Sequence, residues 1–292
     1  MQWRNAIGWL PFGLVLLLGL TMPAEWPHWV FMWFIAAALF FSCKWLTWWT
    51  VRTEGVAVGR QLGYWFAWPG FDAGTFFWGR SFKPTSTGEW LFAFVKLGFG
   101  VAVVLGVYTR FPIDLEYTRG WIGMIGIAFI LHFGVFHLMS LAWRSAGVAA
   151  THIMDWPILA ASGSDFWGRR WNKAFRDLTH RFLFRPLTVR FGGKPALVVG
   201  FFFSGLVHEI VISWPAGSGY GGPTLFFLLQ AAAILFERSW SGRQLGLGHG
   251  LIGWSFTAVV LVGPVFLLFH PPFLRMVVAP FLDWVTGIGG ES

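Results

Sequence analysis

One histidine, His208, stands in a long apolar stretch of the sequence, with a serine four residues before it and a glutamate directly after it. A neutral imidazole can act as a general base on a hydroxyl group, which here would have to arrive through the lipid phase. Ser204 lies one helical turn earlier on the same face, so it could share or orient the proton. Glu209 is turned about 100° away, so we expect it to pair with another helix. A hydrogen-bonded structural role for His208 is the competing interpretation.

A basic segment rich in tryptophan precedes this stretch. Asp165 is a suitable helix N-cap, and Arg185-Pro186 should end the helix that follows it, because proline lacks the amide donor. A period of 3.6 residues places on one face Trp167, Trp171, Ala174, Phe175, Leu178 and Phe182. It places on the opposite face Arg169, Arg170, Lys173, Arg176, Asp177, His180 and Arg181. The pattern predicts one amphipathic helix lying flat on the membrane surface.

Asn172 falls at the seam between the two faces, where a polar amide could reach into a cavity. The basic face has two interpretations. It could anchor the segment on anionic lipid head groups. Alternatively, it could bind a phosphate-bearing cosubstrate, because guanidinium groups hold phosphate oxygens bidentately. The histidine 36 residues after Asn172 favours the second interpretation.

The composition indicates what kind of protein carries these residues. Of the 292 residues 56% are hydrophobic and 12% are charged, about half the charged fraction of soluble domains, and 33 Phe and 21 Trp are present. We therefore expect an integral membrane protein. The net charge of +8 lies mostly in loops, where it sets orientation, so no nucleic-acid partner is expected. The single cysteine excludes an intrachain disulfide and a cysteine-based metal cluster.

Seven apolar segments are long enough to be candidate membrane spans, although several are short for a full crossing. The first resembles a signal peptide, but no convincing cleavage site follows it, so we expect it to be retained. The segments are Ile7 to Met22, Trp29 to Cys43, Trp90 to Thr109, Trp121 to Trp143, Pro195 to Trp214, Thr224 to Phe236 and Leu251 to Phe269.

The basic residues predict the orientation of these spans. With the N-terminus in the cytoplasm, 17 Lys and Arg lie inside and three outside. Both long loops, from Lys44 to Glu89 and over 144–194, are then cytoplasmic. The first loop carries the aromatic stretches Tyr64 to Phe71 and Phe76 to Gly79, which favour an interfacial or re-entrant element.

Other polar residues in the spans are expected to be hydrogen-bonded structural groups. His132 and His137 are five residues apart and so do not share a helix face, and Glu237 ends the sixth span. No metal site is predicted.

The central motifs resemble those of a known family. The segment Asp165-Phe-Trp-Gly-Arg-Arg-Trp-Asn172, followed by Ser204-Gly-Leu-Val-His208-Glu209, is similar to the signature of the membrane-bound O-acyltransferases, especially their wax synthase branch. Trp68-Pro-Gly-Phe-Asp72 resembles a further aromatic segment of those proteins. The resemblance covers about 45 residues strongly, and the chain is shorter than many relatives.

This resemblance implies an all-α polytopic fold of about 7–9 membrane helices around an intramembrane tunnel, with amphipathic or re-entrant helices on the cytoplasmic side. It implies one acyltransferase domain over residues 1–292 with its core signature at 164–209. His208 would be the catalytic base and Asn172 the second active-site residue. The supporting residues would be Ser204, Glu209 and Trp171, and acyl-CoA would be bound by Arg169, Arg170, Lys173 and Arg176.

The implied reaction joins an acyl group from acyl-CoA to a lipid alcohol, with no cofactor. A fatty alcohol would give a wax ester, and a diacylglycerol or sterol another neutral lipid. The protein would reside in the cytoplasmic membrane of a bacterium or the endoplasmic reticulum of a eukaryote, among membrane lipids, with a homo-oligomer left open. A transporter or lipid flippase with an intramembrane His/Glu path is the alternative, although no paired halves are found. A polysaccharide or secreted peptide acceptor is a third interpretation, but the outside loops are short and uncharged.

Overall fold

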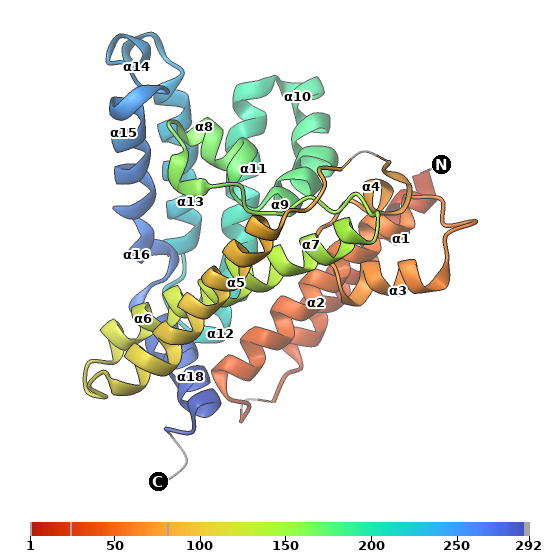
Figure 1. The fold of residues 1–292 in the computed structure, drawn as a ribbon. Helices are drawn as coiled ribbons and strands as arrows, with labels where there is room; N and C mark the ends of the chain where they lie inside the picture. Colours follow the sequence, from red (N-terminus) through yellow and green to blue (C-terminus); the bar gives the residue numbers. More distant parts are fainter. Residues whose placement is uncertain (1, 24, 81, 289–292) are drawn as a thin grey trace. The chain divides into compact units, whose positions relative to one another are not determined.

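The computed structural model describes residues 2–23, 25–80 and 82–288, with side chains from residue 7 on. Every regular element within these ranges is a helix, as Figure 1 shows. The chain divides into two compact units, one made of the residues up to Ile153 and those from Arg275 on, the other of Met154–Leu274. The expected all-α polytopic membrane protein is confirmed. The single acyltransferase domain stays a prediction.

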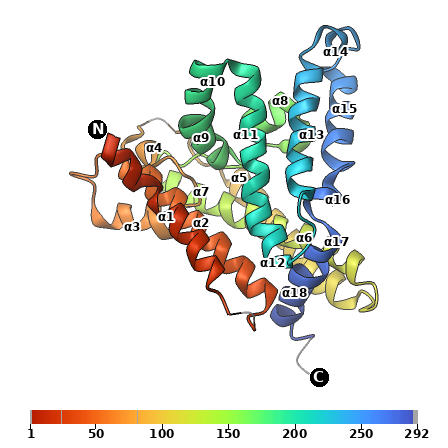
Figure 2. The same cartoon turned by 180° about the vertical axis from the view of Figure 1, so that it is seen from behind.

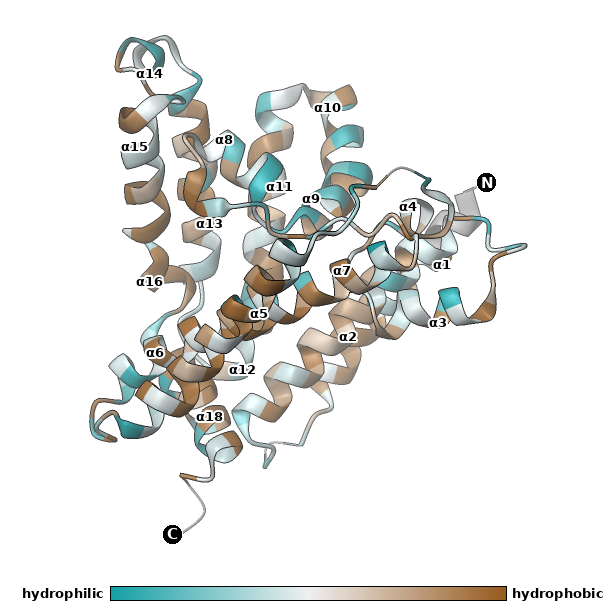
Figure 3. Ribbon diagram, viewed as in Figure 1, coloured by the Kyte–Doolittle hydropathy of each residue, from teal (hydrophilic) through white to brown (hydrophobic). Residues whose placement is uncertain are grey.

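All seven predicted apolar segments are found as helices. Two are shorter apolar helices, Ile7–Leu20 and Gly222–Glu237. The others are long and apolar enough to cross a bilayer: His28–Trp49, Thr87–Arg110, Glu116–Ser145, Gly193–Ala216 and Gly250–Leu268. Their hydrophobic colouring is plain along α5 in Figure 3. The number that crosses the bilayer, the orientation and the tunnel stay predictions.

The first unit contains long apolar helices and two short helices in the first long loop. Its α-helices are α1 (Gln2–Leu20), α2 (His28–Trp49), α3 (Val58–Phe66), α4 (Ala73–Trp78), α5 (Thr87–Ala102), α6 (Glu116–Ala128), α7 (Phe136–Ser145) and α18 (Ala279–Thr286). Wider π-helical turns extend or join them at Val103–Val107, Phe129–Val135 and Leu274–Val278, and a 3-10 turn follows at Tyr108–Arg110.

Lys44 shows why one predicted boundary was wrong. The predicted loop begins at this lysine, whereas α2 continues to Trp49. The Lys44 side chain is fully buried, its Nζ donates to the Gly70 carbonyl at 2.6 Å and lies 3.8 Å from the centre of the Tyr64 ring. A lysine with these partners does not end a helix, because its polar atom is hydrogen-bonded by the loop that folds back on it. The aromatic first loop is thus packed on protein through α3 and α4.

The second unit carries the motifs. Its α-helices are α8 (Gly163–Asp165), α9 (Lys173–Thr179), α10 (Arg185–Phe191), α11 (Gly193–His208), α12 (Trp214–Ala216), α13 (Gly222–Glu237), α14 (Trp240–Gln244), α15 (Gly250–Val262), α16 (Val265–Leu268) and α17 (Pro271–Phe273). A 3-10 turn lies at Pro157–Leu159, and π-helical turns lie at Phe166–Arg170, His180–Phe184 and Glu209–Ser213. Figure 2 shows α10 and α11 as a pair joined by a short turn, with α11 beside α13.

The single amphipathic helix predicted after Asp165 is wrong. The chain makes a π-helical turn over Phe166–Arg170, breaks at Trp171 and Asn172, and starts again as α9. Asn172 has a positive φ of 38°, which no continuous right-handed helix contains. Trp167 and Trp171 therefore do not share one helical stripe.

The predicted stop at Arg185-Pro186 is also wrong, because helical structure continues through α10 to Phe191. The amide of Arg185 donates five residues back, to the carbonyl of His180. Such a wide turn leaves one carbonyl without its usual donor, so a proline at the next position removes little.

Candidate active site

His208 is the last residue of α11 and lies inside the candidate span Gly193–Ala216. Its Nδ1 lies 2.7 Å from the backbone carbonyl oxygen of Ser204. A carbonyl can only accept, so Nδ1 carries the proton and donates it. In the neutral ring Nε2 then has the free lone pair, which is the arrangement that a general base requires.

Ser204 orients His208, but not through the group expected from the sequence. Its hydroxyl donates to the Gly200 carbonyl at 3.1 Å, which is an ordinary bond to the preceding helical turn. The backbone carbonyl of Ser204 holds the imidazole instead. The side chain at 204 is therefore not required for the ring's tautomer.

Glu209, the residue that follows α11, pairs with another helix, as expected from its position next to His208. Its Oε1 accepts from the amides of Gly221 and Thr224 and from the Thr224 hydroxyl, all within 3.0 Å. These donors lie at the start of α13, where amides lack partners within the helix and where a negative charge is favoured. Glu209 thus fixes the beginning of α13 beside the end of α11.

Asn172 forms the N-cap of α9. Its Oδ1 accepts from the amide of Phe175 at 3.2 Å, and its own backbone amide donates to the sulfur of Met154 at 3.2 Å. Because Oδ1 is used by the cap, the assignment of the amide group follows, and Nδ2 is the donor on its other side. Trp171, next to it, stacks on Phe166 with ring centres 5.4 Å apart.

Aromatic side chains connect the two halves of the signature. Trp167 contacts Phe227 of α13 with ring centres 5.5 Å apart, and His208 contacts the same Phe227 at 4.5 Å. Trp167 also donates its indole N–H to the side-chain oxygen Oε1 of Gln230, at 3.4 Å. The motif before Asn172 and the end of α11 therefore pack on one side chain of a third helix.

The first residues of the motif are tied to the end of α13. Glu237 is buried and accepts from the amide of Gly163 at 2.7 Å and from the hydroxyl of Ser164 at 3.0 Å. The structural role predicted for Glu237 is thus seen in its contacts.

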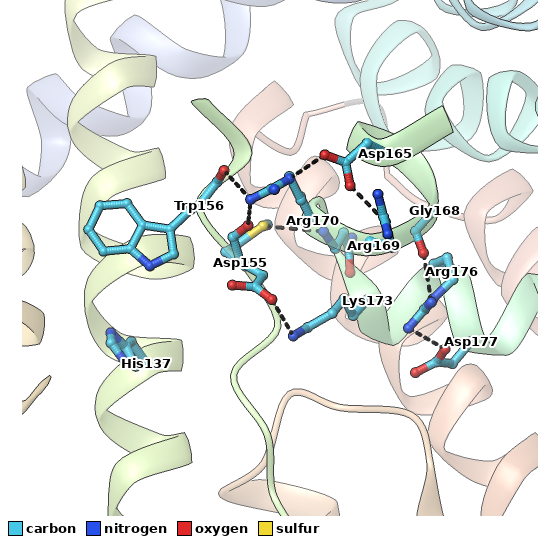
Figure 4. Close-up of polar contacts among 12 residues, drawn as sticks. His137, Asp155, Trp156, Asp165, Gly168, Arg169, Arg170, Lys173, Arg176 and Asp177 are labelled. Carbon is cyan, nitrogen blue, oxygen red and sulfur yellow. Dashed lines mark hydrogen bonds and ion pairs between the residues drawn. The ribbon is translucent and has the colours of Figure 1, made fainter. Parts of the chain in front are cut away.

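The four cations expected to bind phosphate are mostly engaged within the protein (Figure 4). Arg170 donates to Asp165 at 2.6 Å and to the carbonyls of Asp155 and Trp156 at 3.3 Å. Arg169 also pairs with Asp165, at 2.8 Å, yet 76% of its side chain is exposed.

The other two cations lie on α9. Lys173 lies 3.6 Å from the Asp155 carboxylate, and burial lowers the pKa of its amine although this acid acts in the opposite direction. Arg176 donates to the Gly168 carbonyl at 2.7 Å and pairs with Asp177 at 2.8 Å. Arg169 is therefore the cation most available to a ligand.

The part of the chain that holds this arrangement is similar to known proteins. Residues 150–229 match the profile of the Membrane bound O-acyl transferase family, and this range contains both halves of the signature. The chain is 31% identical over 182 residues to a "Long-chain-alcohol O-fatty-acyltransferase" of Simmondsia chinensis, covering 55% of this chain and 50% of that one.

The central part of the chain, residues 150–229, is similar to the Membrane bound O-acyl transferase family.

Two further proteins are similar to parts of the chain. "Acetyltransferase eriL" of Hericium erinaceus is 32% identical over 125 residues, covering 34% of this chain and 32% of that one. "Probable long-chain-alcohol O-fatty-acyltransferase 7" of Arabidopsis thaliana is 28% identical over 137 residues, covering 41% and 39%. The matched part thus spans half or less of the length of these three relatives.

Sequence reasoning missed several residues around the O-acyl transferase motif. Met154 and Asp155 contact the turn at Asn172, and Phe227 joins Trp167 to His208. Gln230, which binds Trp167, was missed as well. Its position as a polar residue within an apolar helix could have indicated a role.

One cluster in the first unit has metal-ligand residue types. Glu89, His137 and His152 bring ligand atoms within 4.8 Å of one another. However, Arg144 donates to both oxygens of Glu89, at 2.7 and 3.0 Å, and Lys96 lies 2.8 Å from Nδ1 of His137. Nε2 of His137 itself lies 3.3 Å from Oε1 of Glu89, so these contacts describe a buried polar network.

Proposed function

We propose that this protein is an acyl-CoA-dependent O-acyltransferase that esterifies a lipid alcohol, with a long-chain fatty alcohol and a wax ester as the substrate and product. The observation that carries the proposal is the state of His208. Its Nδ1 is fixed on the Ser204 carbonyl inside an apolar helix, and its Nε2 is left to accept a proton.

Two side chains, those of His208 and Asn172, carry out the proposed reaction. Nε2 of His208 removes the proton of the alcohol, and the alcohol oxygen attacks the thioester carbonyl of acyl-CoA. Nδ2 of Asn172 donates a hydrogen bond to the oxyanion of the tetrahedral intermediate. The carbon–sulfur bond then breaks, the ester is released, and the protonated His208 returns its proton to the CoA thiolate. No covalent acyl-enzyme is formed.

The relatives support this substrate class. The proteins of Simmondsia chinensis and Arabidopsis thaliana are named for acyl transfer to long-chain alcohols. The protein of Hericium erinaceus is named an acetyltransferase, so acyl chain length needs its own test.

The test is an acyltransfer assay with purified protein in detergent. Labelled acetyl-CoA and long-chain acyl-CoA are offered with separate pools of fatty alcohol, diacylglycerol and sterol, to wild type and to His208→Ala. We expect a labelled wax ester from wild type with long-chain donor and fatty alcohol, and none from folded His208→Ala.

Other outcomes would change the substrates, the mechanism or the class of function. Product from another pool would replace the fatty alcohol as acceptor, and product only from acetyl-CoA would replace the donor. Full turnover by His208→Ala would remove His208 from the mechanism. Folded wild type that releases no CoA with any pool would contradict the acyltransferase proposal and favour transport.

A further inference from the structure

A short segment at the start of the second unit, Met154–Trp156, lies against the turn that contains Asn172. The amide of Asp155 donates to the carbonyl of Arg170 at 2.8 Å, and the guanidinium of Arg170 donates back to the carbonyls of Asp155 and Trp156 at 3.3 Å. Figure 4 shows these three residues in contact. The segment is thus bound to the residue two positions before Asn172.

The same segment also binds Asn172 itself and the residue after it. The sulfur of Met154 accepts from the backbone amide of Asn172 at 3.2 Å. The carboxylate of Asp155 lies 3.6 Å from Nζ of Lys173. Met154 therefore holds the backbone amide of Asn172, and Asp155 holds its neighbours Arg170 and Lys173.

This support matters because Asn172 has an uncommon backbone conformation. Its φ of 38° lies in the left-handed region, which asparagine adopts more readily than other non-glycine residues but which is unusual at a helix N-cap, where the backbone is normally extended. Trp156 is the other described non-glycine residue with a positive φ, 47°. Both of the segments that meet here therefore contain a non-glycine residue with a positive φ. The conformation at 172 sets where Nδ2 lies, because the side chain is also fixed by its cap on Phe175.

We propose that Met154 and Asp155 are positioning residues that hold Asn172 in its left-handed conformation and thereby aim Nδ2 at the reacting carbonyl. This inference rests on the proposed function. Met154 and Asp155 would extend the proposed site by two residues that act through Asn172 and touch no substrate. Displacement of a catalytic group by about 1 Å can lower turnover about a hundredfold, so a partial loosening should lower kcat and leave both KM values unchanged.

Two conservative variants test the inference. Met154→Leu keeps the volume and removes the sulfur acceptor, and Asp155→Asn keeps the shape and removes the charge beside Lys173. Met139→Leu, at a half-buried methionine of the first unit, and Asp177→Asn, at the acid paired with Arg176, are the matched controls. We expect kcat to fall about three- to tenfold in the first two variants and to be unchanged in the controls.

A double-mutant cycle distinguishes positioning from a general structural role. If Met154 acts through Asn172, Met154→Leu should lower kcat in wild type and have no further effect in Asn172→Ala. An equal loss in both backgrounds would overturn the inference, as would an unchanged kcat in Met154→Leu and Asp155→Asn. The thermal midpoint of each variant in detergent shows that the compared proteins are folded.

The same variants also distinguish a failure of the positioning role from a failure of the proposed function. Wild-type turnover in Asn172→Ala would contradict the role of Asn172 and therefore the proposed mechanism. A large loss in Asn172→Ala combined with full turnover in Met154→Leu and Asp155→Asn would leave the mechanism standing and overturn the positioning role alone.

Discussion

At the scale of single residues, Asn172 and His208 share one property. Each uses one polar atom to fix its own side chain, Oδ1 on the Phe175 amide and Nδ1 on the Ser204 carbonyl. The opposite atom, Nδ2 or Nε2, then has a defined direction and a defined role as donor or acceptor. This arrangement suits a site in which an oxyanion and a hydroxyl must be bound by different groups.

Replacement of Asn172 by two different residues separates the cap from the donor. Asn172→Asp keeps an oxygen for the Phe175 amide, whereas Asn172→Ala removes it, so only the alanine variant should lose about 1 kcal/mol of stability. Both lack Nδ2, so both should lose about a hundredfold in kcat. Turnover close to wild type in the aspartate variant would show that the cap alone matters. Kinetics and thermal midpoints in detergent provide both values.

The two neighbouring arginines should differ in the same assay. Arg169 is largely exposed, so Arg169→Gln should raise the KM for acyl-CoA about tenfold without changing that for the alcohol. Arg170 binds Asp165 and the carbonyls of Asp155 and Trp156, so Arg170→Gln should lower the thermal midpoint. Equal effects on the two KM values in Arg169→Gln would argue against phosphate recognition by this residue.

Some contacts of the candidate site residues could be predicted from the sequence, and others could not. The partner of Glu209 on another helix could be inferred because a neighbour in a helix points about 100° away from His208. The use of the Ser204 carbonyl rather than its hydroxyl could not, because it depends on the rotamers of two side chains. The engagement of Arg170 and Lys173 by Asp155 likewise depends on a fold that brings residue 155 to residue 170.

At the scale of elements, α11 and α13 meet closely at Gly205. A Cβ atom added there would lie 2.6 Å from the Cα of Thr224, at the start of α13 where Glu209 binds. Gly205→Ala should therefore separate the helices and destabilise the protein by about 1–3 kcal/mol. Gly200, one turn and a residue earlier, has no such neighbour, so Gly200→Ala should leave stability unchanged or raise it by up to about 1 kcal/mol.

Unfolding of both glycine variants in the same detergent provides the comparison. Equal stability of Gly205→Ala and wild type would show that α11 and α13 can move apart at no cost. A lower kcat in Gly205→Ala would be expected as well, since Phe227 of α13 contacts His208.

The long helices could be predicted because the length of an apolar segment is enough to identify them. All seven predicted apolar segments are helices. The basic segment was mispredicted because periodicity assumes a continuous helix. Asn172 interrupts it with a left-handed residue whose amide is bound by Met154, 18 residues earlier, and whose neighbours Arg170 and Lys173 are bound by Asp155. A pattern of local spacing does not contain such a contact.

At the scale of the whole molecule, the remaining prediction is orientation, which rests on 17 basic residues predicted inside against three outside. The span Gly193–Ala216 separates two exposed positions, Val189 before it and Ser218 after it. Val189 should face the cytoplasm and Ser218 the opposite side. Orientation matters for the proposed reaction, because acyl-CoA would then reach the motif from the cytoplasm.

Single cysteines at these two positions test the orientation. Cys43, the only cysteine of the chain and a buried one, is first replaced by alanine. In sealed bacterial spheroplasts a membrane-impermeant maleimide should label Ser218→Cys and spare Val189→Cys until the membrane is opened by detergent. Labelling in the reverse order would place the basic motif outside and remove the cytoplasmic route for acyl-CoA. Labelling of both cysteines in sealed spheroplasts would show that Gly193–Ala216 does not cross the bilayer, and His208 would then no longer lie within a membrane-crossing helix.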